Sequence, residues 1–299
     1  MPELPDLTIY QEAIEARLVG ESLIGIRILN PFVLRTVSPE VTAFAGCRFT
    51  GTRRIGKRIV LCFQPAQGAS LFAVVHLMLA GRFQWYQSGS KIPHRLGLMG
   101  FDFPGGTLGL TEASQKHRAA LHLVQGENAL AEFNLGGLEL KDATLPSFKA
   151  SLSQENHTLK RSMTDQRFLA GIGNAYSDEI LHRAKISPMR QIKYLSDDQW
   201  QSLFEACLTV ISEWTNRLRE KTGESFPKKV TAFQPEMAVH GKFKQPCPDC
   251  GNPVQRIRYA TNECNYCAAC QNQGNLLADR SLSRLLKKDW PKTLEELDQ

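Results

Sequence analysis

The sequence predicts an α+β protein of several domains, because three different residue patterns follow one another along its 299 residues. Short strand-like runs occupy residues 1 to about 130, and apolar positions at helical spacing dominate residues 147–222. A cysteine-rich segment begins at residue 247. A chain of this length can bury two or three separate cores. We therefore expect an N-terminal antiparallel sandwich or barrel, a helical domain and a C-terminal zinc ribbon.

The N-terminal part is expected to begin with one helix and to continue as strands. Leu7, Tyr10, Ile14 and Leu18 recur at helical spacing after Asp6, a possible N-cap. The runs that follow are rich in β-branched and aromatic residues and are separated by glycine and proline. Strands this short and closely spaced are typical of a sandwich or barrel. The expected strands are residues 23–29, 59–63, 71–77, 82–86 and 107–110.

The middle of the chain is expected to be helical. An apolar face runs from Trp200 to Leu218, and Ser196 with Gln199 has the spacing of a capping box. Upstream, a glycine turn at residues 170–173 precedes a helix that opens near Asn174 and ends before Pro188. Residues 223–239, which include Lys228, Lys229 and two prolines, are expected to form a mobile loop.

Composition and charge exclude several classes of protein. A hydrophobic content of 42% with 22% charged residues excludes a disordered or fibrous chain. The net charge of +6 favours an anionic partner without establishing one. The N-terminus lacks the features of a signal peptide, and the longest apolar stretch, residues 71–80, is too short for a membrane span. Since Cys47, Cys62 and Cys207 lie singly among apolar neighbours, we expect a reducing, cytoplasmic compartment and no membrane.

The cysteine-rich segment predicts a structural metal site. Two CxxC pairs, separated by sixteen residues, can place four thiolates around one zinc ion with no open position for a catalytic water. Cys264 with Cys267 also has CxxC spacing, and a redox or disulfide cluster is a further alternative. Arg256, Arg258 and Tyr259 between the pairs suit phosphate contact and base stacking, or else a solvated hairpin. The expected zinc ligands are Cys247, Cys250, Cys267 and Cys270.

The first residues carry a second chemical signal. Initiator methionine is normally removed before a small residue such as Pro2, and removal would expose a secondary amine beside Glu3. An α-amine has a lower pKa than lysine, so more of it is neutral at pH 7 and able to attack an aldehydic sugar carbon. Glu3 could move protons in such a reaction. Alternatively, Pro2 reflects methionine removal alone.

Two further patterns suit phosphate binding. The segment AGIGN at residues 170–174 places glycines before a helix, where backbone N–H groups can approach a phosphate and Asn174 can add a donor. The same glycines could serve turn geometry only. A basic run near the expected strands could bind phosphate or form a solvated face. Its members are Arg48, Arg53, Arg54, Lys57 and Arg58.

Taken together, the motifs resemble the formamidopyrimidine-DNA glycosylase and endonuclease VIII family. The resemblance spans Pro2 to Gln271 and implies a base-excision repair enzyme that binds damaged DNA. It implies an N-terminal β-sandwich, a helix-two-turn-helix domain and a zinc ribbon with one structural Zn²⁺, and no organic cofactor. The motifs are MPELP at residues 1–5, GK at 56–57, HL at 76–77, AGIGNAY at 170–176, ISP at 186–188 and the four-cysteine ribbon.

The resemblance also implies roles for individual residues. Pro2 would be the nucleophile on the deoxyribose C1′ of a flipped-out nucleotide, and Glu3 the acid and base. The iminium formed would allow β- and δ-elimination, which nicks the strand. Lys57 would hold phosphate near the lesion. Leu79 or Met78 would fill the gap left by the flipped base. The other implied DNA contacts are Lys160 near the damaged nucleotide, Asn174 on backbone phosphate, His76, and Arg256 and Arg258 in the hairpin.

The implied domains are residues 1–130, 131–235 and 236–275, with a tail at 276–299, and we expect a monomer. The sequence also departs from the family pattern. Asn262 stands where the zinc hairpin of the family carries an arginine, and residues 111–118 lack the usual arginine and phenylalanine pair. Asp6 replaces a glutamate and Lys244 a glycine. These departures favour an alternative, a non-catalytic binder of damaged or abasic DNA. A zinc protein that binds RNA is a more distant alternative.

Overall fold

The computed structural model describes residues 1–114, 116, 118–228, 230–259, 262–279, 285 and 291–297. It divides into two compact units, one of Met1–Leu135 with Trp214–Thr231 and one of Gly136–Glu213 with Ala232–Gln299. The three domains and the tail predicted from the sequence divide the chain differently and stay a prediction. Among the described residues, no helix combines the length and the apolar character that a membrane crossing requires.

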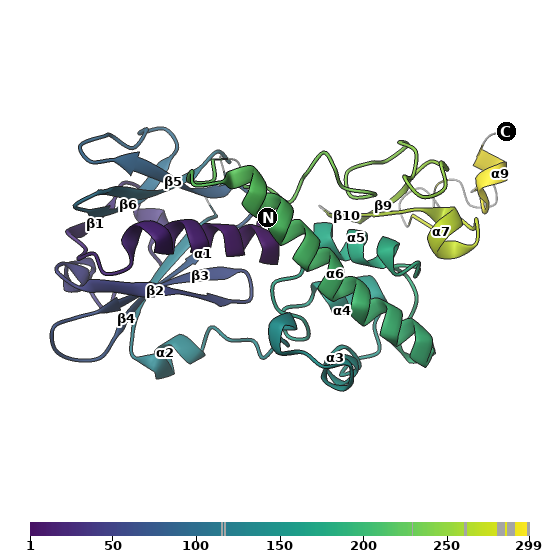
Figure 1. Cartoon of the computed structure of the whole chain (residues 1–299), viewed down its shortest axis with the longest axis horizontal. Helices are drawn as coiled ribbons and strands as arrows, with labels where there is room; N and C mark the ends of the chain where they lie inside the picture. The colour runs from purple at the N-terminus through teal and green to yellow at the C-terminus, as the bar shows by residue number, and fades with distance from the viewer. Residues whose placement is uncertain are drawn as a thin grey trace. The chain divides into compact units, whose positions relative to one another are not determined.

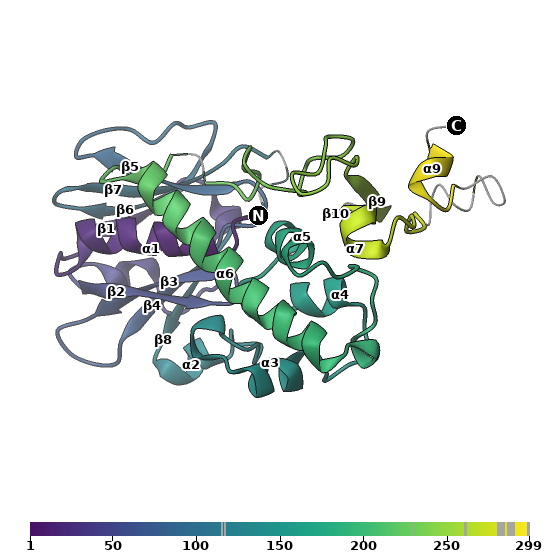
Figure 2. The same ribbon diagram turned by 45° about the vertical axis from the view of Figure 1, so that its right-hand side comes forward.

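The first unit is a sandwich of two antiparallel four-stranded sheets with one helix between them. The sheets have the strand orders β1-β6-β7-β5 and β2-β3-β4-β8. Figures 1 and 2 show α1 (Leu4–Leu18) running between the two sheets. Its apolar side chains join the inner faces of both sheets in one buried cluster. The strands are β1 (Gly25–Ile28), β2 (Arg48–Ile55), β3 (Arg58–Gln64), β4 (Leu71–His76), β5 (Gly81–Gln87), β6 (Gly97–Phe103), β7 (Gly106–Glu112) and β8 (Ala120–Gln125).

A second, smaller apolar cluster lies on the outer face of the β2-β3-β4-β8 sheet. Val60, Phe72 and Val74 point to this face, where Leu130 of α2 (Glu127–Ala131) covers them. Because both faces of β3 and β4 are buried, these strands are almost continuously apolar instead of alternating. Two short 3-10 turns, η1 (Pro31–Val33) and η2 (Val41–Phe44), connect β1 to β2.

The second unit contains helices and a small hairpin. In α6 (Asp197–Thr222), Ser196 and Gln199 form the predicted capping box, with N–H bonds of 3.2 Å to each other's side chains. The C-terminal part of α6 belongs to the first unit. The elements of the second unit are η3 (Leu140–Asp142), α3 (Leu145–Leu152), α4 (Leu159–Thr164), α5 (Asn174–Arg183), η4 (Ile192–Tyr194), the antiparallel pair β9 (Gln255–Tyr259) and β10 (Asn262–Tyr266), α7 (Ala268–Asn272) and α9 (Leu294–Leu297).

Most predicted elements are confirmed, with two corrections. The helix at the N-terminus begins at Leu4 with Glu3 as its N-cap, so the prediction that Asp6 caps it is wrong. Asp6 occupies the third helical position, from which its carboxylate accepts the backbone N–H of Glu3. The sequence prediction also missed β2, β6 and β8. In the segment predicted as a loop, residues 223–228 and 230–239 contain neither helix nor strand, and Lys229 lies outside the described residues.

Candidate active site and metal centre

Pro2 and Glu3 are both buried at the start of α1. Pro5 in the first turn favours a helix start here, since proline has the required φ and lacks an N–H that would be unpaired. Glu3 and Asp6 form a capping box, in which the N–H of Glu3 donates to Oδ2 of Asp6 at 2.9 Å. The other oxygen of Asp6, Oδ1, is buried and has no hydrogen-bond partner among the described residues. The chain terminus is thus held in one orientation by its own first helical turn.

The surroundings of the terminus favour a neutral amine. Burial lowers the pKa of the N-terminal amino group of Met1; the cations Arg82 and Lys57 lower it further, whereas Glu3 and Asp6 act in the opposite direction. Burial also raises the pKa of Asp6 to about 7. The sequence reasoning missed Arg82, which lies at the start of β5 and carries no motif of its own.

Lys57 and His76 come from adjacent parts of one sheet. Lys57 lies in the turn between β2 and β3, and His76 ends β4, directly opposite Arg58 in the strand register. Burial, followed by the charges of Arg58 and Lys57, lowers the pKa of His76 to about 4. His76 is therefore a neutral hydrogen-bonding group at pH 7.

Leu79 projects from the tight turn between β4 and β5. Its side chain is 65% exposed, whereas the preceding Met78 has a φ of 53°, a left-handed conformation that side chains other than glycine rarely adopt. Arg82 bonds the carbonyl oxygens of Leu79 at 3.1 Å and Gly81 at 2.6 Å, which holds the turn. Of the two residues the sequence allowed in this role, Leu79 is the one at the exposed tip.

The loop after β7 is anchored at its base. The carboxylate of Glu112, itself buried, accepts the backbone N–H groups of Arg118 at 3.1 Å and Ala119 at 2.9 Å. Gln115 and His117 of this loop lie outside the described residues. Arg118 is exposed.

In the second unit, the glycine turn leads into α5. Gly171 has a φ of 82°, which requires glycine in practice, and its N–H donates to Oε1 of Gln166 at 2.9 Å. Gly173 is the N-cap of α5 and Asn174 its first residue. Asn174 is half-buried, and its side-chain amide donates to the backbone oxygen of Glu263 at 2.7 Å. The turn and the hairpin are therefore directly connected.

Lys160 is not at the surface. Its side chain is 2% exposed, and its ammonium donates to the backbone oxygen of Asn174 at 2.6 Å, Oγ of Ser177 at 2.8 Å and Oδ1 of Asp178 at 2.5 Å. A direct contact with DNA would require this network to open. Lys160 instead holds the backbone of Asn174 at the start of α5.

Asp178 and Glu179 connect α5 to the hairpin and to the loop before it, and sequence reasoning missed both. Oδ2 of Asp178 lies 2.8 Å from the ring Nδ1 of His240, and it accepts a hydrogen bond from the backbone N–H of Asn265 at 3.1 Å. The Glu179 carboxylate accepts three successive backbone N–H groups, those of Ala238, Val239 and His240, at 2.8 to 2.9 Å. The available signal was a pair of carboxylates in a helix that is largely buried, because buried carboxylates need hydrogen-bond or ionic partners.

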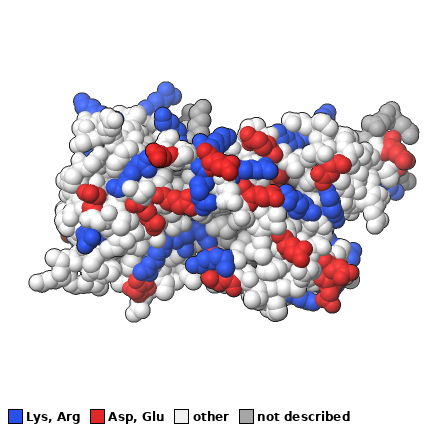
Figure 3. Space-filling model, in the orientation of Figure 1, with Lys and Arg blue, Asp and Glu red and all other residues white. Residues whose placement is uncertain are grey.

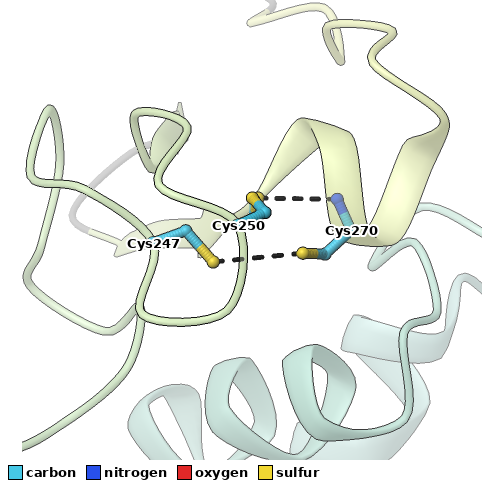
Figure 4. Close-up of side chains that lie close together, drawn as sticks. Cys247, Cys250 and Cys270 are labelled. Carbon is cyan, nitrogen blue, oxygen red and sulfur yellow. Dashed lines mark hydrogen bonds between the residues drawn. The ribbon is translucent and has the colours of Figure 1, made fainter.

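The four predicted cysteine ligands lie together. Their sulfur atoms are all within 4.8 Å of one another. Figure 4 shows Cys247 facing Cys270, with an Sγ to Sγ distance of 4.0 Å, and the corresponding distance from Cys250 to Cys267 is 3.4 Å. A tetrahedral zinc site with bonds of about 2.3 Å separates its sulfurs by about 3.8 Å. The cluster is therefore compatible with one zinc ion bound by four thiolates.

Cys264 lies outside this cluster. It is fully buried in an apolar group with Ile257, Tyr266 and Ala268, and burial raises the pKa of its thiol well above the usual value. The alternative pairing of Cys264 with Cys267 therefore has no support in the geometry.

The basic side chains of the hairpin differ in how accessible they are for contact with DNA. Arg256 pairs with Glu263 at 3.4 Å and lies over the ring of Phe243, whereas Arg258 is exposed. Asn262 is the first residue of β10, opposite Tyr259. On the face of the molecule drawn in Figure 3, basic and acidic side chains are interspersed. Candidate DNA contacts must therefore be argued residue by residue.

Comparisons with known proteins show that this chain has the domains of a DNA glycosylase family. The formamidopyrimidine-DNA glycosylase N-terminal domain matches residues 1–126, and the H2TH domain of the same enzyme matches residues 137–223. A formamidopyrimidine-DNA glycosylase-like protein of Mycobacterium tuberculosis, itself uncharacterized, is 38% identical over 151 residues, which cover 50% of this chain and 94% of that protein. The formamidopyrimidine-DNA glycosylase of Desulforamulus reducens is 28% identical over 284 residues, with 91% of this chain and 99% of that protein covered.

Solved structures show the same fold. The Lactococcus lactis Fpg in complex with DNA containing an abasic site has a TM-score of 0.77 at 22% identity, covering 90% of this chain and 99% of that one. A MutM complex with DNA containing carbocyclic 8-oxo-G has a TM-score of 0.76 at 23% identity, covering 91% and 100%. The chain belongs to the formamidopyrimidine-DNA glycosylase and endonuclease VIII family, as its sequence motifs predicted.

Proposed function

We propose that this protein is a DNA glycosylase that removes damaged bases and then cuts the strand at the resulting abasic site. The observation that carries the proposal is the buried Pro2–Glu3 start of α1, surrounded by groups that favour a neutral amine. The family supports it, since relatives are named formamidopyrimidine-DNA glycosylase and related structures hold abasic or oxidised DNA. We further propose that it acts as a monomer in a reducing, cytoplasmic compartment.

The proposed nucleophile is the secondary amine of Pro2 after removal of Met1. Its lone pair attacks C1′ of the damaged nucleotide, the bond from C1′ to the base breaks, and the base leaves with that electron pair and a proton. Glu3, beside the amine, delivers and recovers protons. The amine then loses its proton, the sugar ring opens as the C1′–O4′ bond breaks, and O4′ takes up a proton, which leaves an iminium between C1′ and the Pro2 nitrogen. Removal of a proton from C2′ then allows β-elimination of the 3′ phosphate, and removal of a further sugar proton allows δ-elimination of the 5′ phosphate. In the chain that retains Met1, burial, with the charges of Arg82 and Lys57, lowers the pKa of the terminal amine, and we expect the same surroundings to favour a neutral amine at Pro2.

Other residues bind the DNA in this proposal. Lys57, neutral His76 and Asn174 contact phosphates, exposed Leu79 fills the space left by the flipped base, and Arg258 contacts the backbone from the hairpin. Lys160 acts indirectly, because its ammonium fixes the start of α5 where Asn174 lies. Arg256 supports the hairpin through Glu263 and reaches phosphate only if that pair opens.

Cys247, Cys250, Cys267 and Cys270 would hold one structural zinc ion. The ion supplies a cross-link between the two ends of the hairpin and has no open position for chemistry when bound by four thiolates. The hairpin segment buries only two small apolar clusters, so we expect its shape to depend on that cross-link.

A second candidate is a non-catalytic binder of damaged DNA. It is favoured by Asn262 at the position of the family's hairpin arginine and by the altered loop 111–118. The two candidates share DNA binding and differ in covalent chemistry.

Trapping with borohydride on DNA that contains an abasic site tests the proposal. Reduction of the iminium should cross-link the wild-type protein and the control Pro65→Gly, which changes a proline of the β3–β4 loop, whereas Pro2→Gly should cross-link far less. N-terminal sequencing should begin at Pro2. Tight binding without cross-link or incision would establish the non-catalytic binder, and equal trapping of Pro2→Gly would exclude Pro2 as the nucleophile. A panel of single-lesion duplexes, scored for base release, then identifies the substrate.

A further inference from the structure

Three of the four clustered sulfur atoms lie within hydrogen-bond distance of a nitrogen atom. Asn252 Nδ2 lies 3.5 Å from Sγ of Cys250, and the backbone N–H of Cys270 donates to Sγ of Cys267 at 3.5 Å. Both donors belong to the cysteine loops themselves. The third nitrogen, Nε2 of His182, lies 3.3 Å from Sγ of Cys247 and comes from the last turn of α5. His182 thus connects the metal centre to a helix far away in the sequence.

The contact between His182 and Cys247 is enclosed by protein. His182 is 4% exposed and Cys247 is 2% exposed, so water competes little for either group. Oδ2 of Asp249 lies 3.8 Å from Nε2 of His182 and also accepts a hydrogen bond from the ammonium of Lys185. The ring nitrogen of His182 therefore lies beside the Cys247 sulfur, and a carboxylate paired with Lys185 lies beside that nitrogen.

This arrangement allows a different interpretation, a second metal ion. His182, Asp249 and Cys270 place one ligand atom each within 4.8 Å of the others. However, Lys185 already supplies a cation to Asp249, and a metal ion there would be repelled by that ammonium. A hydrogen bond from His182 to the sulfur requires no such displacement.

A hydrogen bond to the sulfur has a clear physical purpose. Zinc with four thiolates carries two net negative charges, and burying them is costly unless donors surround the sulfurs. An N–H donor withdraws charge from a thiolate, which makes the sulfur less basic and less open to attack by protons or oxidants. Partners of this kind, one bond beyond the ligands, typically change metal affinity by about 10- to 100-fold when they are removed.

We propose that His182 is a positioning residue for the zinc centre: its Nε2–H donates to the Cys247 thiolate, slows loss of the metal and anchors the first cysteine loop to α5. The inference rests on the proposed zinc site, but it does not depend on catalysis. It adds a residue from the helical part of the chain to a centre whose ligands all lie in the C-terminal part.

The test uses the zinc-loaded full chain and measures zinc transfer to a chromogenic chelator. His182→Phe keeps a ring and removes the donor, and we expect it to release zinc at least about ten times faster than wild type. His182→Gln keeps an N–H donor, and it should release zinc at a rate closer to wild type. Arg183→Met is the matched control on the same helix; it removes only an exposed pair with Glu213 and should leave the rate unchanged.

A second measurement needs no variant. Nitrogen-15 NMR of the histidine rings in the zinc-loaded wild type should show a proton on Nε2 of His182. An unprotonated Nε2, or a release rate of His182→Phe equal to wild type at one zinc per chain, would overturn the inference. Two zinc ions per chain, with one lost in His182→Phe, would replace it with a second metal site. A wild-type chain without zinc would instead contradict the proposed zinc site itself.

Discussion

The ammonium of Lys160 lies 2.5 Å from a carboxylate oxygen of Asp178, and both side chains are buried. Burial alone would raise the pKa of Asp178, but Lys160 and His240 hold it below its usual value. The same carboxylate bonds His240 and Asn265, so one buried anion joins α4, α5 and the hairpin. The position of the hairpin relative to α5 therefore depends on a charge balance as well as on metal binding.

Loss of Lys160 should destabilise the protein strongly. Lys160→Met leaves a buried carboxylate without its main cation, which typically costs about 3 to 5 kcal/mol of unfolding free energy. Lys149→Met removes an exposed pair with Asp197 and should cost less than about 1 kcal/mol. Urea titrations of both variants provide the comparison. Unchanged stability of Lys160→Met, together with weaker DNA binding, would show that Lys160 contacts DNA directly.

Asp6 should make stability depend on pH. Its pKa of about 7 in the folded protein lies above the unfolded value of 3.8, so the folded state binds the extra proton between these limits. Its contribution to stability is therefore complete below pH 4 and is lost as the pH rises through 7. Asp6→Asn resembles the protonated form, so its unfolding free energy should exceed that of wild type increasingly from pH 4 to 8, by up to about 4 kcal/mol.

Denaturant titrations at several pH values measure this difference. Asp142→Asn, which changes an exposed aspartate of η3, is the control and should follow the wild-type profile. Parallel profiles of Asp6→Asn and wild type would mean that Asp6 is ionised at neutral pH in spite of its burial.

Zinc content should distinguish the two neighbouring cysteines. Cys267→Ala removes one of the four clustered sulfurs and should lose the metal, whereas Cys264→Ala changes an apolar core position and should keep about one zinc per chain. Elemental analysis of the purified variants decides between them. Retention in Cys267→Ala with loss in Cys264→Ala would reverse the assignment.

Lys57 should contribute one phosphate contact. The affinity for abasic DNA should fall steeply with salt, because bound phosphates release counterions, and Lys57→Ala should reduce the slope by about one. Lys141→Ala, at an exposed site in η3, should leave the slope unchanged. Fluorescence anisotropy at increasing salt gives both slopes. An affinity of the wild type that does not change with salt would contradict DNA binding through phosphates.

Some elements could not be predicted because their sequences lack local signals. β2 has the charged sequence RFTGTRRI, and β6 carries Gly97 and Gly100, where an added Cβ would approach Ile92 closely. These strands form because neighbouring strands pair with them, not because of their own propensity. The capping prediction was wrong for a related reason. Aspartate is a residue type that favours the N-cap position, but Pro5 fits the first helical turn and allows the helix to begin at Leu4, directly after Glu3.

By itself, the sequence determined the order of the parts, the long capped helix, the spacing of the cysteines and the family, because periodicity, caps and motifs are local properties of the chain. Only the tertiary structure decided that Cys264 is a core thiol, that Lys160 is paired inside the protein, and that His182 contacts Cys247. Burial and partners depend on which elements pack together, so residues far apart in sequence acquire their chemistry only in the folded chain.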